Sequence, residues 1–473
     1  MPKPMQAILE KIESQALSMG REVYVVGGAV RDLLLGRLAP DIDLAIDRDA
    51  LAFGRQLATI LPGKFIILDE GEGVGRLVCH GHVVDIAVFK NESQTIEEDL
   101  VKRDFTINAM AITLADWLRR ESALTIIDPC TGQKDIRDRV IRLVYKEALE
   151  DDPLRILRGF RLQASTGFTL DQDFVDMAER EKKLLAKPAA ERITSELHLI
   201  FDSSRAFEIV GAMAKSGILA QVCPEIMSGL GVEQPASHHL DVLEHNLAAL
   251  QAMDDIIIRP EHYFPKSATV MAAYLEGPRR RRWLRWAALF HDLGKPPTRA
   301  TKEGRITFYQ HDQVGAQIFR DMAKRLRFAN IDIDKVSLLI SQHMRPFHLC
   351  NILRQGPVSA KACLRLAKSI GDDLPGLFLL AMADSLAGQG EAKPQDMEKE
   401  LALLFQQVHR QVEEFIAPVL TGPPLLTGHD LINAGFAPGP AFKKILDDLQ
   451  QAQVAGEVVG RAAAFKWLEA FKE

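Results

Sequence analysis

Apolar and polar positions follow two different periods along this chain of 473 residues. Up to about residue 145, short β-rich runs alternate with helical stretches and glycine turns, as in EVYVV, DIDLAI, KFIIL, GHVVDIAVF and LTIID. From about Leu149 onward, apolar residues recur every three to four positions, as in DPLRILRGFRLQASTGF and ERITSELHLIF, which is typical of amphipathic helices. The pattern therefore predicts an α+β head followed by a mainly α-helical remainder.

Breaks rich in proline and glycine divide the helical part. They lie near Pro224, at GPRRRR from Gly277 and at LTGPPLLTG from Leu420. The chain is also too long for one ordinary core, since a domain usually holds roughly 100–200 residues. We expect four parts, with boundaries at 1–145, 146–225, 226–400 and 401–473.

Composition excludes several classes of protein. The apolar fraction of 47% and the charged fraction of 26% are average for globular proteins and give no sign of disorder. No run of about 18 apolar residues occurs, so we expect a cytoplasmic protein with no membrane partner. The five cysteines are scattered, which favours reduced thiols over disulfides or a thiolate zinc site. Because the net charge is −6, a nucleic-acid partner would need local basic faces.

A glycine turn follows the first predicted strand, in EVYVVGGAVRDLLLG. Gly27 and Gly28 let the backbone approach a triphosphate closely. The helix that begins after them offers free N–H groups to the phosphates, and Arg31 can add a charge-assisted contact. This segment predicts a phosphate-binding turn.

A pair of aspartates stands on the next predicted strand. Asp41 and Asp43 are separated by one residue, so both carboxylates project from the same face. Mg²⁺ prefers carboxylates plus substrate phosphates, and a pair of ions about 3.5–4 Å apart can activate a 3′-hydroxyl and neutralise a leaving pyrophosphate. Asp85, in GHVVDIAVFK, is the candidate for a third catalytic acid.

Either piece alone has a simpler interpretation, an ordinary Gly-Gly turn or an exposed strand end. Together, GGAVRDLLLG and DIDLAI resemble the polymerase-β-like nucleotidyltransferases, and specifically the class II (bacterial-type) tRNA nucleotidyltransferase and poly(A) polymerase family. The resemblance implies a nucleotidyltransferase head that uses Mg²⁺, ATP and CTP to add CCA to the 3′ end of tRNA. The reaction would be in-line attack of the RNA 3′-hydroxyl on the α-phosphate.

Further motifs extend the resemblance along the chain. In EEDLVKRDFTINAMA, family members hold the sugar and phosphates of the nucleotide with the counterparts of Arg103, Asp104 and Asn108. The Arg–Asp pair could instead be only a helix cap and surface ion pair. IIDPCTGQKDI resembles a flexible connector, which implies a hinge.

EDDPLRILRGFR resembles the motif that reads the edge of the incoming base. By that match Asp152 and Arg155 select C and A, while Asp151 stands where relatives usually have Glu. Arg155, Arg158 and Arg161 recur every three residues, so they share roughly one helix face that could meet RNA phosphates. The alternative is a solvated face paired with nearby acids.

Histidines gather from residue 238 onward, in HHLDVLEHNLAAL, FHDLGKPP, FYQHDQVGAQ and ISQHMRP, followed by LLAMADSLA. These segments resemble the HD phosphohydrolase superfamily. The resemblance implies that a divalent transition metal is held by His245, His291, Asp292 and Asp384. A second ion or a phosphate would be held by His311 and His343. Lys295 would bind the phosphate of a phosphoester, and we expect an active phosphatase or phosphodiesterase.

Two remaining segments suggest RNA contacts. GPRRRRWLRW offers five arginines and two tryptophans that could grip phosphates and stack on bases, or simply start a solvated helix. LTGHDLINAGFAPGPAFKKILDDLQQAQVAGEV resembles the family's C-terminal tail, with Phe442, Ile445, Leu446 and Leu449 on one apolar face.

Four alternatives remain open at this point: a poly(A) polymerase, an enzyme that adds only CC or only A, a protein that is chiefly an HD hydrolase, and a non-catalytic RNA-binding regulator. The sequence leaves the oligomeric state open as well.

Overall fold

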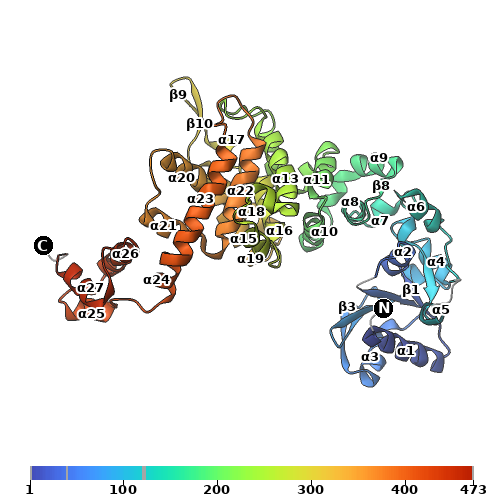
Figure 1. Cartoon of the computed structure of the whole chain (residues 1–473). Helices are drawn as coiled ribbons and strands as arrows, with labels where there is room; N and C mark the ends of the chain where they lie inside the picture. The colour runs from blue at the N-terminus through green and yellow to red at the C-terminus, as the bar shows by residue number, and fades with distance from the viewer. Residues whose placement is uncertain (1–2, 39–40, 120–123, 471–473) are drawn as a thin grey trace. The chain divides into compact units, whose positions relative to one another are not determined.

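The computed structural model describes residues 3–38, 41–119 and 124–470. The chain forms two compact units, residues 1–200 with 213–222 and residues 201–212 with 223–473 (Figure 1). The predicted boundaries at 145, 225 and 400 stay predictions. Among the described residues, no helix is both long and apolar enough to cross a membrane.

The first unit begins with a six-stranded sheet in the order β3-β4-β5-β2-β1-β6. Neighbouring strands are antiparallel except for the parallel pair β2 and β5. The elements of this head are α1 (Lys3–Ser18), β1 (Val23–Val26), α2 (Gly28–Leu34), β2 (Ile42–Ile46), α3 (Ala50–Ile60), β3 (Gly63–Asp69), β4 (Val74–Cys79), β5 (His82–Val88), α4 (Ile96–Leu100), β6 (Ala111–Thr113) and α5 (Leu114–Arg119). The mixed α+β head is therefore confirmed.

One predicted strand of the head is wrong. LTIID (124–128) forms no strand, and its only ladder contact is a single bridge between Ile127 and Ala111. The edge position beside β1 belongs to β6, inside NAMAITL, whose three residues gave too short a pattern to stand out. Strand β4 was also missed, because the glycines of GEGVGR obscure the alternation of VGRLVC, in which every second residue is buried.

Short helices follow the head and complete the first unit. They are α6 (Gly132–Asp138), α7 (Ala148–Asp151), α8 (Arg155–Thr166), α9 (Gln172–Glu181), α10 (Ala190–Asp202), α11 (Ala206–Lys215) and α12 (Ile218–Val222), with a small parallel pair of β7 (Val140–Ile141) and β8 (Thr169–Leu170). Helices α10 and α11 carry the chain between the two units. α8 is strongly amphipathic, with Ile156, Leu157 and Phe160 buried.

The second unit is almost entirely helical. Its main helices are α13 (Val242–Ile258), α15 (Ala268–Leu275), α16 (Arg280–Phe290), α18 (His311–Arg325), α19 (Asn330–Gln342), α20 (Arg345–Leu353), α21 (Ala360–Ile370), α22 (Leu374–Ala387) and α23 (Met397–Gln411), with short helices α14 (Pro260–Tyr263) and α17 (Lys295–Thr298) and the hairpin of β9 (Arg299–Lys302) and β10 (Arg305–Phe308). The central helix is α22, which is buried on nearly every side and packs against α13, α16 and α23.

The C-terminal helices have a small core of their own. After α24 (Ala417–Thr421), helices α25 (Gly428–Asn433), α26 (Pro440–Val454) and α27 (Gly460–Glu469) bury Leu431, Ile445 and Leu449 together. Phe442 and Leu446 pack against the same cluster, so the predicted apolar face of this segment is confirmed. The face serves packing within the tail.

Candidate active sites in the head and the HD region

The glycine turn between β1 and α2 lies against the predicted acids. Gly27 has a left-handed φ of 71°, which favours glycine. A Cβ at Gly27 would lie 3.6 Å from Asp43 Oδ2 and 3.7 Å from Arg103 Nη1. Gly28 lies against Arg31, whose guanidinium donates to Asn108 Oδ1 at 2.8 Å. The turn thus brings Asp43 and Arg103, sixty residues apart, to the same place.

The acids of the head stand across two strands. Asp41 lies immediately before β2 and Asp43 on it, while Asp85 on β5 is in register with Asp43. Side chains in register on neighbouring strands share a face, so Asp43 and Asp85 are neighbours. Partial desolvation by the surrounding protein, with the nearby charge of Asp85, raises the pKa of Asp43, although its side chain still reaches solvent. Such an arrangement favours a cation, which would remove the repulsion between the carboxylates.

Asp85 has a partner that the sequence did not reveal. Arg76, in register with Asp85 on β4, donates from Nε to Oδ1 and from Nη2 to Oδ2, both at 2.8 Å. This is a two-point guanidinium–carboxylate pair. The sequence pattern does not predict β4, so it cannot predict the register between β4 and β5 that brings Arg76 to Asp85.

The predicted nucleotide-binding residues are held by a connected set of ion pairs. Arg103 contacts Asp99 at 2.7 Å, and Asp104 forms an ion pair with Arg158 at 2.8 Å and accepts a hydrogen bond from the Phe105 N–H at 2.8 Å. Burial opposes the ionisation of Asp104, but Arg158 and the backbone donor outweigh it and lower the pKa to about 2. Asp104 is therefore a carboxylate at neutral pH.

The predicted base-reading residues are linked through a tyrosine that sequence reasoning missed. Tyr145 donates its hydroxyl to Asp151 Oδ2 at 2.7 Å and accepts from Arg155 Nη1 at 2.7 Å. Arg155 is buried and also donates to the Ala148 carbonyl, while Asp152 accepts from Arg192 at 2.9 Å. Tyr145 lies outside the recognised motif, so only the turn before α7 places it there.

Arg155, Arg158 and Arg161 do not form a free basic stripe. Arg155 is buried, Arg158 contacts Asp104, and Arg161 donates to Glu196 at 2.6 Å. These contacts favour the alternative in which acids of the same unit pair with the helix face.

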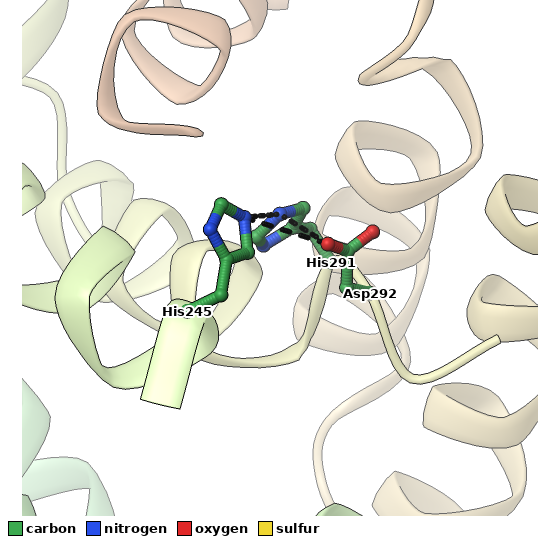
Figure 2. A group of neighbouring side chains, drawn as sticks. All are labelled: His245, His291 and Asp292. Atoms are coloured by element: carbon green, nitrogen blue, oxygen red, sulfur yellow. Dashed lines mark hydrogen bonds and ion pairs between the residues drawn. The ribbon is translucent and has the colours of Figure 1, made fainter. Parts of the chain in front are cut away.

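Figure 2 shows the first half of the histidine cluster, in which His245 of α13 and the adjacent His291 and Asp292 at the end of α16 point toward one another. His245 Nε2 lies 3.2 Å from His291 Nε2 and 3.5 Å from Asp292 Oδ2. Asp384 of α22 closes this half, with Oδ1 3.1 Å from His245 Nε2. Nδ1 of His291 donates to the Ala288 carbonyl at 3.0 Å, which leaves Nε2 as the ligand atom.

The second half of the cluster shares Asp292. His311 Nε2 and His343 Nε2 lie 3.4 and 3.7 Å from Asp292 Oδ1, and 3.2 Å from each other. Their Nδ1 atoms both approach backbone carbonyls at 2.7 Å. All six predicted residues therefore converge, with Oδ2 of Asp292 facing one half and Oδ1 facing the other.

The donor set fits a bound cation. Both oxygens of Asp292 are buried, and the imidazole nitrogens and carboxylate oxygens of each group lie within 4.8 Å of one another, close enough to share one ion. Burial works to lower the pKa of His291, but Asp292 and Asp384 outweigh it and raise that pKa to about 10. Burial and the neighbouring His311 lower the pKa of His343 to about 3. Neutral imidazole is the form that binds metal, so a metal ion in the first half of the cluster would displace a proton from His291.

A cavity of about 520 Å³ opens onto this cluster. Asp292, His311 and Asp384 line it together with Lys295, whose Nζ lies 2.5 Å from Asp292 Oδ2 and donates to Gln234 Oε1 at 2.6 Å. An ammonium group that lines a cavity beside a metal-binding cluster can hold the phosphate of a substrate.

The prediction that GPRRRRWLRW could stack on bases is wrong. Trp283 and Trp286 are both buried, and Trp286 stacks on Phe201 with ring centroids 3.8 Å apart. Arg285 is buried too and donates to Asp254, while Trp283 donates to Asp332 at 2.6 Å. The segment begins a core helix, because its apolar period places both indoles on the inner face.

Three protein families match segments of the chain. Residues 23–142 match the Poly A polymerase head domain, residues 167–230 match the probable RNA and SrmB-binding site of polymerase A, and residues 261–387 match the HD domain. These segments contain most of the residues described above.

Relatives match nearly the whole chain. The A-adding tRNA nucleotidyltransferase of Deinococcus radiodurans is 32% identical over 457 residues, 94% of this chain and 95% of that protein. The CC-adding tRNA nucleotidyltransferase of Thermus thermophilus is 32% identical over 447 residues, 93% of this chain and 91% of that protein. The solved structure of a CCA-adding enzyme with CTP has the same fold, with a TM-score of 0.65 at 20% identity, covering 100% of this chain and 96% of that one. This chain belongs to the tRNA nucleotidyltransferase and poly(A) polymerase family, with an HD domain.

Proposed function

We propose that the chain adds C and A, from CTP and ATP, to the 3′ end of tRNA, and that it works in the cytoplasm. The observation that carries the proposal is the meeting of Asp43, Asp85, Gly27 and Arg103 at one end of the head sheet. The matches to tRNA nucleotidyltransferases over more than nine tenths of the chain support tRNA as the substrate over an RNA of another kind.

Asp41 and Asp43, with Asp85 as third acid, would hold Mg²⁺ at the end of the sheet. When bound, Mg²⁺ supplies positive charge that activates the 3′-hydroxyl of the RNA and neutralises the pyrophosphate that leaves. Gly27 supplies the left-handed backbone of the turn, and a Cβ there would lie in van der Waals contact with Asp43 and Arg103, in the space that the triphosphate would approach. Arg31 and Arg103 supply the guanidinium donors, and Asn108 and Asp99 hold those donors in place.

Base selection would fall to Asp152 and Arg155. The guanidinium of Arg155 is fixed by Tyr145 and by the Ala148 carbonyl, so the side chain loses little conformational entropy when a base binds. Asp151, shorter by one methylene than the usual Glu, reaches Tyr145 rather than the neighbouring guanidinium. A preorganised donor and acceptor favour C and A over bases with the opposite pattern.

A second candidate is an enzyme that adds only CC or only A. Its support is that the two relatives spanning more than nine tenths of the chain bear those names, whereas the Multifunctional CCA protein of Pseudomonas syringae, 30% identical, covers 68% of this chain. The two candidates predict different products from the same RNA.

The decisive experiment supplies the full-length protein and Mg²⁺ with three tRNA transcripts, ending before CCA, after C and after CC. CTP and ATP are given separately and together, and the products are sequenced. CCA on the first transcript establishes the proposal. CC alone on the first transcript, or A on the third transcript without extension of the first, establishes the second candidate. A long A tract shows a poly(A) polymerase. No extension of any transcript would refute all of them.

For the HD region we propose a metal-dependent phosphohydrolase. His245, His291, Asp292 and Asp384 would hold a divalent transition metal, and His311 and His343 a second ion or a phosphate. The bound metal supplies hydroxide at neutral pH. Lys295 would orient the phosphoester in the cavity. Elemental analysis that finds no transition metal, with no hydrolysis of any phosphoester, would refute this assignment.

A further inference from the structure

Three charged side chains form a row across the head sheet. The register aligns Asp43 of β2 with Asp85 of β5, and Asp85 with Arg76 of β4. Residues in register share a face, so the row runs Asp43, Asp85, Arg76. Arg76 holds both oxygens of Asp85 at 2.8 Å and also lies within electrostatic reach of Asp41 and Asp43.

The other cations near the row are held by acids outside it. Arg103 contacts Asp99, and Arg158 contacts Asp104. Among the described residues, Asp85 is the one acid in ion-pair contact with Arg76. Arg103 and Arg158 also act on Asp43 electrostatically, so Arg76 is distinguished as the cation that pairs directly with the third acid, Asp85.

We propose that Arg76 is a positioning residue that fixes Asp85 beside Asp43 and weakens the binding of a divalent ion by the acids of the head in the absence of a nucleotide. The inference rests on the proposed assignment of Asp41, Asp43 and Asp85 as the metal-holding acids. A guanidinium lowers the affinity of nearby carboxylates for a second cation, because the two positive charges repel. Metal would then enter with the triphosphate, whose phosphates supply the missing ligands.

Both side chains of the Arg76–Asp85 ion pair are partly exposed to solvent. The side chain of Arg76 is 41% exposed and that of Asp85 is 24% exposed. Partly exposed ion pairs contribute little to stability except where their geometry is two-point, as it is here, so this pair can stabilise the sheet as well as act on a cation held by the neighbouring acids.

The test measures Mn²⁺ binding to the full-length protein without nucleotide, by the loss of the free Mn²⁺ spin-resonance signal. Sites that disappear in Asp43→Asn are assigned to the head, which separates them from sites in the HD region. We expect Arg76→Gln to tighten binding at the head sites about fivefold. Arg76→Lys, which retains the charge, should stay within about twofold of the unsubstituted protein.

A matched control is Arg21→Gln, because Arg21 pairs with Asp49 at 2.9 Å at the opposite end of β1 and β2. It should not change Mn²⁺ binding. The Mg²⁺ concentration for half-maximal nucleotide addition gives a second readout, and Arg76→Gln should lower it.

The outcomes separate the inference from the proposed function. If Asp43→Asn leaves Mn²⁺ binding unaltered both alone and combined with Arg76→Gln, the assignment of the acids fails. If Asp43→Asn removes sites but Arg76→Gln leaves their affinity unchanged or weakens it, the role of Arg76 fails and the assignment of the acids stands.

Discussion

The two candidate active sites of this chain are built in opposite ways. The head site consists of carboxylates and guanidinium groups at the ends of strands, and Arg76 and Asp85 remain partly exposed. The HD site consists of imidazole nitrogens and carboxylates from helices, and His245, His291, Asp292 and His343 are almost completely buried. The acids of the head are thus partly open to solvent, whereas the HD donors are buried beside a cavity.

The two sites would therefore bind their cations in different ways. The head offers few hard oxygen ligands, so the phosphates of the nucleotide must complete the coordination of Mg²⁺. The HD cluster already brings six donors together, so the protein itself can retain a transition metal. The comparison predicts that activity in the head depends on added Mg²⁺, and that metal in the HD region copurifies with the protein.

The largest expected effect separates the two sites. Asp43→Asn should slow nucleotide addition about 10³-fold, because it removes a metal ligand beside the reacting phosphate. Single-turnover extension of a tRNA transcript measures the rate, and elemental analysis should find the HD metal content unchanged. Asp49→Asn, a substitution at the far end of β2, is the control and should keep nearly the full rate. Full activity in Asp43→Asn would contradict the enzymatic assignment of the head.

The converse experiment removes a ligand of the HD cluster. His291→Ala should weaken transition-metal binding about 100-fold, since its Nε2 faces His245, Asp292 and Asp384 together. Metal content after dialysis measures the loss, with the exposed His262→Ala as control. Nucleotide addition by the same sample should stay within about twofold. Metal retained in His291→Ala would show that the cluster is only a packed polar core.

The pH dependence of the head should reflect Asp104. Its pKa is about 2 in the folded chain, against about 3.9 for a free Asp, so ionised Asp104 contributes about 2 kcal/mol of stability above pH 4. That contribution is lost as the pH falls from about 4 through about 2. The gap in melting temperature between the unsubstituted protein and Asp104→Asn should therefore narrow between pH 5 and pH 3. A gap that stays constant would place the stabilisation elsewhere.

The smallest effect concerns base selection. Tyr145→Phe removes one hydroxyl that links Asp151 to Arg155, and should reduce the preference for CTP and ATP over UTP and GTP about fivefold. Ratios of kcat/KM for the four nucleotides measure it. The matched control is Tyr263→Phe, which removes the hydrogen bond from the Tyr263 hydroxyl to Asp255 in the second unit. Equal selectivity in both variants would show that Tyr145 does not support base recognition.

Local patterns predicted most of the fold. The runs around β1, β2, β3 and β5 carry clear strand signals, and the helical period after residue 149 is strong. The failures have physical causes. LTIID has strand composition, but β6 already fills the edge position beside β1, and composition cannot report which segment pairs there. The tryptophans of GPRRRRWLRW lie among arginines, yet helical geometry turns them inward.

The chemistry of the two sites is visible in the sequence: the Gly-Gly turn, the Asp-x-Asp pair and the spaced histidines and aspartates are recognisable because their local geometry requires particular residue types. The partners of these residues depend on tertiary contacts. Arg76 meets Asp85 through strand register, Tyr145 meets Arg155 through a turn, and Asp292 faces both halves of its cluster through the packing of α13, α16, α18, α19 and α22. Such contacts depend on segments far apart in the chain, and no local pattern encodes the distance between them.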